Sequence, residues 1–230
     1  AAEHLPPVTH ELGGKSPCIV AADANMDVTA RRICMGKFFN AGQTCVAPDY
    51  ILVESSAKEA LIESLKNVIE EFYGQAPKES VDYGRIINTR HHQRLMKLLK
   101  GQAVLHGGEY EESDRYIAPT LIDEPAADAA IMQEEIFGPL LPIITVDSID
   151  AAISRVNRGD KPLALYVFTR SDATAEAVLP RTSSGGAVVN HIWLHLAVPG
   201  LPFGGVGESG MGAYHGEHSY RVFSHENAVL

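Results

Sequence analysis

The sequence predicts an α/β fold, because two kinds of segment alternate along the chain. One kind is a short apolar run, and the other is a longer stretch whose apolar residues recur every three or four positions. The first pattern is typical of buried strands, and the second is typical of helices that cover one face of a sheet. The chain has no internal repeat, low-complexity tract or serine-rich linker, which favours one compact domain.

The first strand and helix are predicted near the start of the chain. The apolar run 16–20 favours a strand. Asp27 is a candidate N-cap for a helix that continues to about Asn40, and Gly42 is expected to end it. One face of this helix is apolar and carries Ala30, Ile33, Cys34 and Phe38.

The next strand and helix have the clearest signals in the sequence. A strand is expected over 50–54, after which Ser55 or Ser56 can cap a long helix that Gly74 ends. The apolar residues of this helix keep the i, i+3, i+4, i+7 spacing and are Leu61, Ile62, Leu65, Val68, Ile69 and Phe72.

The remaining elements continue the alternation. Further helices are expected over 89–100, from Asp147 or Ser148 to Asn157, and from an Asp172 cap to Leu179. Further strands are expected over 103–106, 116–122, 140–146, 163–169 and 187–190. The last residues, 223–230, are predicted to form a strand that leaves the domain.

Composition and charge exclude several classes of protein. Hydrophobic residues make up 45% and charged residues 21%, which indicates a globular chain rather than a disordered one. Lys and Arg total 19 against 29 Asp and Glu, so the formal net charge is −10. This acidic balance argues against partners such as nucleic acids and anionic membranes, which bind basic surfaces. Apolar runs such as 140–144 are too short to span a bilayer.

The cysteines and histidines predict neither a disulfide framework nor a metal site. Cys18, Cys34 and Cys45 form an odd set without metal-type spacing, which is typical of a reduced, cytoplasmic protein. Two histidine pairs have helical spacing but lack the intervening glutamate of a zinc-protease helix, namely His191 with His195 and His215 with His218. We therefore expect no bound metal.

A glycine-rich segment near the end of the chain imitates a dinucleotide-binding turn. Residues 205–210 match G-x-G-x-x-G. That fingerprint requires a strand before it and a helix opening at its third glycine. Pro202 disfavours a strand before the match, and residues 211–216 have weak helix propensity. We predict a tight loop near an active site instead.

Three segments contain candidate catalytic side chains. Cys45 lies between a predicted helix and strand in a stretch with flanking Gly42 and Pro48, where catalytic thiols are often found. Glu11 precedes paired glycines, and Glu135 precedes an aromatic residue and a Gly-Pro turn. Taken singly, the thiol is better explained as a small buried hydrophobe, and each acid can be explained as a surface charge or a helix end.

Taken together, these segments resemble the aldehyde dehydrogenase superfamily along almost the whole chain. The motifs stand in family order and are E-L-G-G-K-S-P at 11–17, G-Q-T-C at 42–45, E-E-I-F-G-P at 134–139 and P-F-G-G-V-G-E-S-G-M-G at 202–212. The segments 45–50, 84–88, 161–166 and 212–216 resemble the class 3 group, which oxidises aromatic, medium-chain and fatty aldehydes with NAD or NADP.

The resemblance implies a role for each candidate residue. Cys45 would attack the aldehyde as a thiolate, and the thioester formed after hydride transfer would be hydrolysed by water that Glu11 activates. Glu135 would hold the nicotinamide ribose, Phe137 would pack beside the nicotinamide ring, and the roles of Glu11 and Glu135 are open to exchange. Lys15 would position its loop. A free thiol has a pKa of about 8.5, so Cys45 needs a base or positive charge nearby.

The resemblance also implies a three-layer catalytic domain with a mostly parallel sheet, and a Rossmann-like cofactor domain that this chain lacks. Residues 1–222 would be the catalytic domain, with 1–10 left from the link to the cofactor domain. Residues 223–230 would serve as an oligomerisation arm, and the full-length enzyme would be a cytoplasmic homodimer. Two alternatives for the isolated chain are an inert folding or oligomerisation fragment and a weak cysteine esterase.

Overall fold

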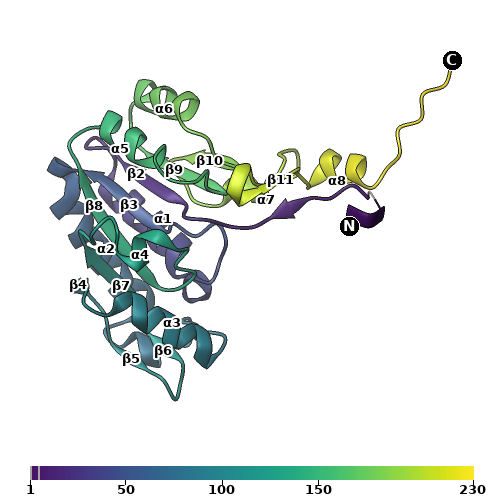
Figure 1. The fold of residues 1–230 in the computed structure, drawn as a ribbon. Coiled ribbons are helices and arrows are strands. Elements are labelled where there is room, and N and C mark those ends of the chain that lie inside the picture. Colours follow the sequence, from purple (N-terminus) through teal and green to yellow (C-terminus); the bar gives the residue numbers. More distant parts are fainter. Residues whose placement is uncertain (1, 5) are drawn as a thin grey trace.

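The computed structural model describes residues 2–4 and 6–230, and its centre is a seven-stranded sheet in the order β10-β9-β2-β3-β8-β7-β4 (Figure 1). The strands are β2 (Pro17–Val20), β3 (Tyr50–Glu54), β4 (Ala103–His106), β7 (Thr120–Asp123), β8 (Leu140–Val146), β9 (Ala164–Phe168) and β10 (Gly186–Val189). All neighbouring strands are parallel except β4 and β7. The predicted α/β fold with a mostly parallel sheet is confirmed.

Helices form a layer on each face of the sheet, because successive strand residues point to opposite sides. On one face Cys18 and Ile51 pack with α1 (Met26–Phe38), α2 (Lys58–Tyr73) and α3 (Thr89–Leu99). On the other face Ile19 and Leu52 pack with α5 (Ile149–Val156) and α6 (Asp172–Val178). This arrangement gives the three layers that the resemblance implied.

Several helix starts differ from the prediction by one or two residues. The N-cap of α1 is Asn25, whose side chain accepts from Val28 N at 3.2 Å, and Asp27 lies in the first turn. Likewise Ser171, rather than Asp172, caps α6. For α5 the cap is Ser148, one of the two predicted candidates. An amide or hydroxyl cap leaves the following acid free to interact with the helix dipole, so the acid was mistaken for the cap.

The long helix α2 starts without a capping side chain. A turn of 3-10 helix, η3 (Ser55–Ala57), leads into it, and its N-cap position is Ala57. Neither Ser55 nor Ser56 caps α2, so that prediction is wrong. Gly74 ends the helix as predicted.

The predicted strand 116–122 is two strands. β6 (Tyr116–Ile117) pairs with β5 (Tyr110–Glu111) in a separate antiparallel hairpin, whereas β7 joins the main sheet. Pro119 lies between them and has no N–H to continue a ladder. The segment is apolar throughout, so its hydrophobic pattern does not show that the hydrogen-bonding partner changes within it.

A two-stranded arm extends from the main sheet (Figure 1). It consists of β1 (His10–Glu11) and β11 (Gly210–Met211), which pair antiparallel. The expected strand 223–230 is not formed within the described residues, where these positions run as an extended tail after α8 (Gly216–Val222). The remaining helical segments are η1 (Ala2–His4), η2 (Phe39–Gly42), η4 (Pro77–Glu79), α4 (Ala130–Gln133), η5 (Leu179–Arg181), α7 (Leu194–Ala197) and η6 (Gly207–Ser209).

The glycine-rich match at 205–210 lies in this arm rather than in a dinucleotide-binding turn. It contains η6 and the start of β11, and no strand leads directly into it. In the part of the chain that the structure describes, no helix is both long and apolar enough to cross a bilayer.

Candidate active site

Cys45 lies on a sharp turn between α1 and β3. After α1 the chain passes through three consecutive left-handed residues, Asn40 (φ 51°), Ala41 (φ 51°) and Gly42 (φ 76°). A turn closed by Ala47 N and Thr44 O at 3.0 Å then presents Cys45. Cys45 is partly exposed, whereas Cys18 and Cys34 are fully buried. Left-handed backbone at two non-glycine residues is costly and is typical of functional turns.

The cysteine turn is fixed against two other segments. A Cβ atom on Gly42 would lie 2.2 Å from the carbonyl oxygen of Gly138, so the E-I-F-G-P segment and this turn meet backbone to backbone. The Gln43 side chain donates to Arg85 O at 3.0 Å and accepts from Ile87 N at 2.9 Å. The glycine and glutamine of G-Q-T-C therefore have structural roles that were not predicted.

Glu135 is held on the opposite side of the site by the paired glycines that follow Glu11. A Cβ on Gly13, whose φ is +80°, would lie 2.8 Å from Glu135 Oε2, and the backbone N–H of Gly14 lowers the pKa of this carboxyl group. Phe137 follows in left-handed conformation (φ 48°) and its side chain is 40% exposed. An exposed aromatic ring beside a carboxylate is free to contact a ligand.

Glu11 reaches the site through the two-stranded arm. It pairs with Gly210, and Leu12 N donates to Ser209 O at 3.0 Å. A Cβ on Gly210 would lie 2.1 Å from His10 O, so only glycine allows this approach. The predicted tight loop is thus the segment that supports Glu11.

Glu11 and Glu135 lie close enough to Cys45 for their charges to act on its thiol. Burial, and then the negative charges of Glu11 and Glu135, raise the pKa of the Cys45 thiol to about 11. The backbone N–H groups of Val46 and Cys45 act in the opposite direction. Since both charged groups acting on the sulfur are acidic, the thiol needs a base to remove its proton at neutral pH.

Glu135 has the proton affinity expected of such a base. Burial, and then the negative charge of Asp49, raise its pKa to about 7. The Gly14 N–H and the positive charges of Lys37 and Lys15 lower it, but they do not cancel the effect of burial. A carboxyl group whose pKa lies near neutrality can both accept and release a proton at the same pH.

Lys15 holds the segment that leads into Glu135. Its ammonium pairs with Asp49 and donates to Ile131 O at 2.8 Å and Glu134 O at 2.9 Å. The interpretation that Lys15 positions its loop agrees with these contacts. Asp49 was not predicted as a site residue.

Two tyrosines near the thiol were also missed. Tyr166 donates from its hydroxyl to Val46 O at 2.5 Å, which holds the residue after Cys45. Burial, then the negative charges of Glu11 and Cys45, raise the pKa of Tyr214, whose phenol lies near Glu11. Tyr214 belongs to the G-A-Y-H-G segment at 212–216, and the apolar strand around Tyr166 gave no signal of function.

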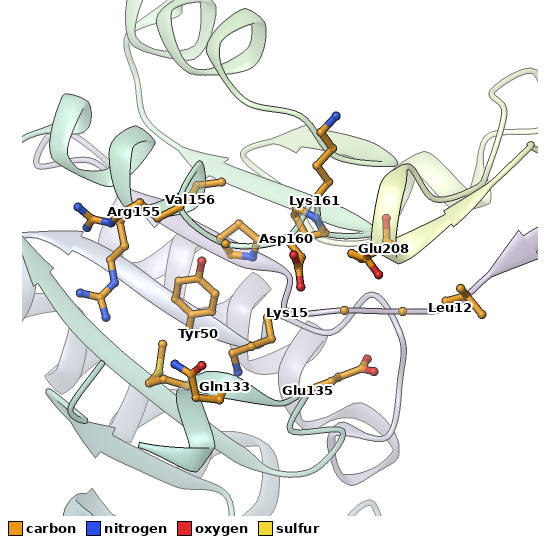
Figure 2. A pocket seen from close by; sticks show the side chains of 18 of the residues that line it. Leu12, Lys15, Tyr50, Gln133, Glu135, Arg155, Val156, Asp160, Lys161 and Glu208 are labelled. Atoms are coloured by element: carbon orange, nitrogen blue, oxygen red, sulfur yellow. The ribbon is translucent and has the colours of Figure 1, made fainter. Parts of the chain in front are cut away.

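A cavity of about 710 Å³ opens beside Glu135. Figure 2 shows Tyr50 and Arg155 at one end, and Leu12 with Glu135 at the other. Cys45 does not line it, so the cavity lies next to the thiol's site rather than around it. Over residues 2–4 and 6–230 there is no group of three histidine, cysteine or acidic side chains arranged to hold a metal ion.

Comparisons with known proteins agree with the motifs. The family model described as the aldehyde dehydrogenase family matches residues 1–229. Over all 230 residues the chain is 53% identical to mouse "Aldehyde dehydrogenase, dimeric NADP-preferring" and covers 51% of it. It is 52% identical to mouse "Aldehyde dehydrogenase family 3 member A2" and covers 48% of that protein.

A solved structure shows the same fold. The chain superposes on the structure titled "Substrate bound state of Staphylococcus Aureus AldH" with a TM-score of 0.95 and 52% identity, covering 98% of this chain and 50% of that one. The chain therefore spans about half the length of the curated relatives it matches.

Proposed function

Because the chain belongs to the aldehyde dehydrogenase family, we propose that it is the thiol-bearing part of an NAD(P)-dependent enzyme that oxidises aldehydes to carboxylic acids. The observation that carries the proposal is the convergence of Glu11 and Glu135 on the one partly exposed thiol, Cys45. The class 3-like relatives favour the same substrate class.

The first step is addition of the thiol to the carbonyl carbon. Glu135 takes the thiol proton, the sulfur of Cys45 forms a bond to carbon, and the carbonyl π electrons move to oxygen. The Cys45 backbone N–H donates to this oxyanion, as the family resemblance implies. The raised pKa of Glu135, about 7, suits this proton transfer near neutral pH.

The residues around Glu135 fit a nucleotide cofactor. The cavity of about 710 Å³ is large enough for part of a dinucleotide, and Glu135 lines it. Phe137, two residues further along the chain, is exposed. Glu135 would bind the ribose and Phe137 would pack on the nicotinamide. Bound NAD or NADP would supply the acceptor for the hydride that leaves the carbon attached to Cys45.

The thioester on Cys45 is then hydrolysed. Glu11 accepts a proton from water as the water oxygen bonds to the thioester carbon, and the C–S bond breaks to release the acid. The Tyr214 phenol, which lies near Glu11, would help to orient this carboxylate. Glu135 remains the alternative base for this step.

A second candidate, ester hydrolysis, needs only residues of this chain. Cys45 can be acylated by an activated ester and Glu11 or Glu135 can assist hydrolysis, without hydride transfer. Ester hydrolysis therefore measures the reactivity of the Cys45 thiol without a requirement for NAD or NADP.

We also propose an assembly and a cellular location. A relative carries the word "dimeric" in its name, and we propose a homodimer in which 223–230 acts as an arm. The reduced cysteines suit a cytoplasmic location.

The proposal is tested by aldehyde-dependent formation of NADH or NADPH with the full-length protein that contains this chain. Cys45→Ala should abolish it. Asn67→Ala, at an exposed position of α2, is the matched control and should retain it. Full activity in Cys45→Ala would contradict the assignment of the nucleophile.

A further inference from the structure

Tyr166 is a fully buried tyrosine in the main sheet. It lies in the middle of β9, all five residues of which are buried, and it is 0% exposed. Its neighbours across the sheet are Cys18 in β2 and Val188 in β10. A buried phenolic hydroxyl is unfavourable without a hydrogen-bond partner, so its partner should explain why a tyrosine occupies this core strand.

The partner of this hydroxyl is the backbone of the residue that follows Cys45. The Tyr166 hydroxyl donates to Val46 O at 2.5 Å, although the two residues are 120 positions apart in the sequence. Val46 is itself 0% exposed, so its carbonyl depends on a donor from the protein. Among residues 2–4 and 6–230 no second hydrogen bond reaches Val46 O. Tyr166 therefore satisfies a buried carbonyl group beside the nucleophile.

The cysteine turn, residues 44–47, has few other restraints. The Gln43 side chain fixes its entry, and Ala47 N donates to Thr44 O at 3.0 Å and closes it. In the part of the chain that the structure describes, the Tyr166 bond is the one side-chain hydrogen bond to these four residues. This bond ties the middle of the turn to β9, whose position is fixed by the strands on either side of it.

The orientation of Val46 matters for the thiol because N–H groups of the turn act on the sulfur. The backbone N–H groups of Cys45 and Val46 lower the pKa of the thiol, whereas burial and the two acids raise it. In the proposed function the Cys45 N–H also donates to the oxyanion. The N–H and the C=O of Val46 are joined through one Cα atom, so a bond that fixes the carbonyl restricts how far the N–H can turn away from the sulfur.

The phenol ring of Tyr166 is itself held in place by close packing. The His195 ring lies edge-on to it, with ring centroids 6.4 Å apart and an interplanar angle of 61°. His195 packs tightly on β10, since a Cβ on Gly186 would lie 2.5 Å from its Cδ2. Neither ring nitrogen of His195 has a hydrogen-bond partner within the described residues, so this histidine does not compete for the hydroxyl. The ring therefore delivers its hydroxyl to one place.

We infer that Tyr166 is a positioning residue for Cys45, and that its hydroxyl holds the cysteine turn in the conformation from which the thiol reacts. The inference rests on the proposed function only in taking Cys45 as the nucleophile. Tyr166 bonds to no reacting atom and acts through Val46 O. Positioning of this kind has a large effect, because displacing a reacting group by about 1 Å can slow a reaction about 100-fold.

The test compares two tyrosines that make the same kind of bond. Tyr83 donates from its buried hydroxyl to the buried Ile117 O at 2.9 Å and provides the matched control. Tyr166→Phe and Tyr83→Phe each remove one hydroxyl and leave one buried carbonyl unpaired, so both should lower the urea midpoint of unfolding by similar amounts. Tyr166→Leu is a second variant without the hydroxyl, and it leaves room for water beside Val46 O if the phenylalanine variant does not fold.

The readout is the reaction of Cys45 in the full-length protein that contains this chain, followed by mass spectrometry of the peptide around it. Alkylation by iodoacetamide at about pH 8.5 and acylation by p-nitrophenyl acetate should both slow about 10-fold or more in the Tyr166 variants. Tyr83→Phe should leave both rates nearly unchanged. Equal rates in the two phenylalanine variants would reduce Tyr166 to a structural residue and overturn the inference, as would unchanged or faster alkylation in the folded Tyr166 variants.

Alkylation separates this inference from the proposed function, because it needs neither cofactor nor aldehyde. If Tyr166→Phe is alkylated at the normal rate and oxidises aldehydes with an unchanged kcat, the role of Tyr166 alone is overturned. Slow alkylation in the Tyr166 variants of a protein that never oxidises an aldehyde supports that role and contradicts the proposed function.

Discussion

Gly13 lies so close to Glu135 that a Cβ atom at position 13 would be 2.8 Å from the carboxylate oxygen Oε2. The glycine, with φ +80°, lets the chain after Glu11 close over the second acid. The two acidic motifs are thus joined by direct contact, and the place of one carboxylate depends on the absence of a side chain in the other motif.

Gly13→Ala should destabilise the protein and displace Glu135. The clash adds to the cost of the positive φ, for a total of about 2–3 kcal/mol. Gly101→Ala is the matched control, because Gly101 has the same φ of +80° with nothing within 4 Å of its Cβ position, and it should cost only about 1 kcal/mol. Urea unfolding measures both. Equal losses of stability would show that the contact with Glu135 does not matter.

Alkylation of Cys45 by iodoacetamide should accelerate with pH up to a midpoint near 11. Glu11→Gln and Glu135→Gln each remove a negative charge from beside the sulfur, so each should lower this midpoint. The double variant should lower it further. We expect the initial alkylation rate, measured as a function of pH, to show this order, and a midpoint insensitive to both acids would place them too far from the thiol.

The stability of the protein should depend on Glu135 in a defined pH range. The folded pKa, about 7, exceeds the ordinary value of 4.5. The stabilising contribution of this group is therefore complete below pH 4.5 and is lost as pH rises through 7. Glu135→Gln should gain stability relative to the unsubstituted protein between about pH 5 and 8. Chemical unfolding at the two ends of this range gives the difference, and a constant difference would contradict the raised pKa.

Lys37→Met should stabilise the protein at neutral pH. Burial lowers the pKa of Lys37 from 10.5 to about 8, so its charged form is disfavoured in the folded state. Lys37 therefore destabilises the folded state most below pH 8, and this destabilisation disappears as the pH rises towards 10.5. The gain in the methionine variant should be about 1–3 kcal/mol near pH 7 and shrink at higher pH. Thermal unfolding of both proteins across this pH range measures the gain. A gain that grows with rising pH would contradict the prediction.

The main sheet and the position of the thiol could be predicted because they depend on local patterns. The strand 140–146 is a continuous apolar run, and its bounds agree with β8. The strand 116–122 was predicted as one element because apolar character does not report on hydrogen-bond partners, which change at Pro119. The sequence motifs singled out Cys45, Glu11 and Glu135, but their proximity in space comes from the tertiary fold.

The residues that support the site were harder to predict. A lysine in an amphipathic helix is expected to face solvent, yet Lys37 follows Ile33 by four positions and Cys34 by three, which puts it on the apolar face. That spacing was the available signal. Asp49 gave no comparable signal, because a single acid before a strand is usually a solvated residue.

The antiparallel pairing of Glu11 with Gly210 has a consequence for the order of folding. These residues lie almost the whole chain apart, so their contact must form after the intervening sheet has brought the two segments near each other. The parallel strands and the turn that holds Cys45 can assemble earlier, from segments much closer in sequence. A newly made chain would therefore form the turn that holds Cys45 before Glu11 reaches it, and under the proposed function the hydrolytic step would have to wait for the last stage of folding.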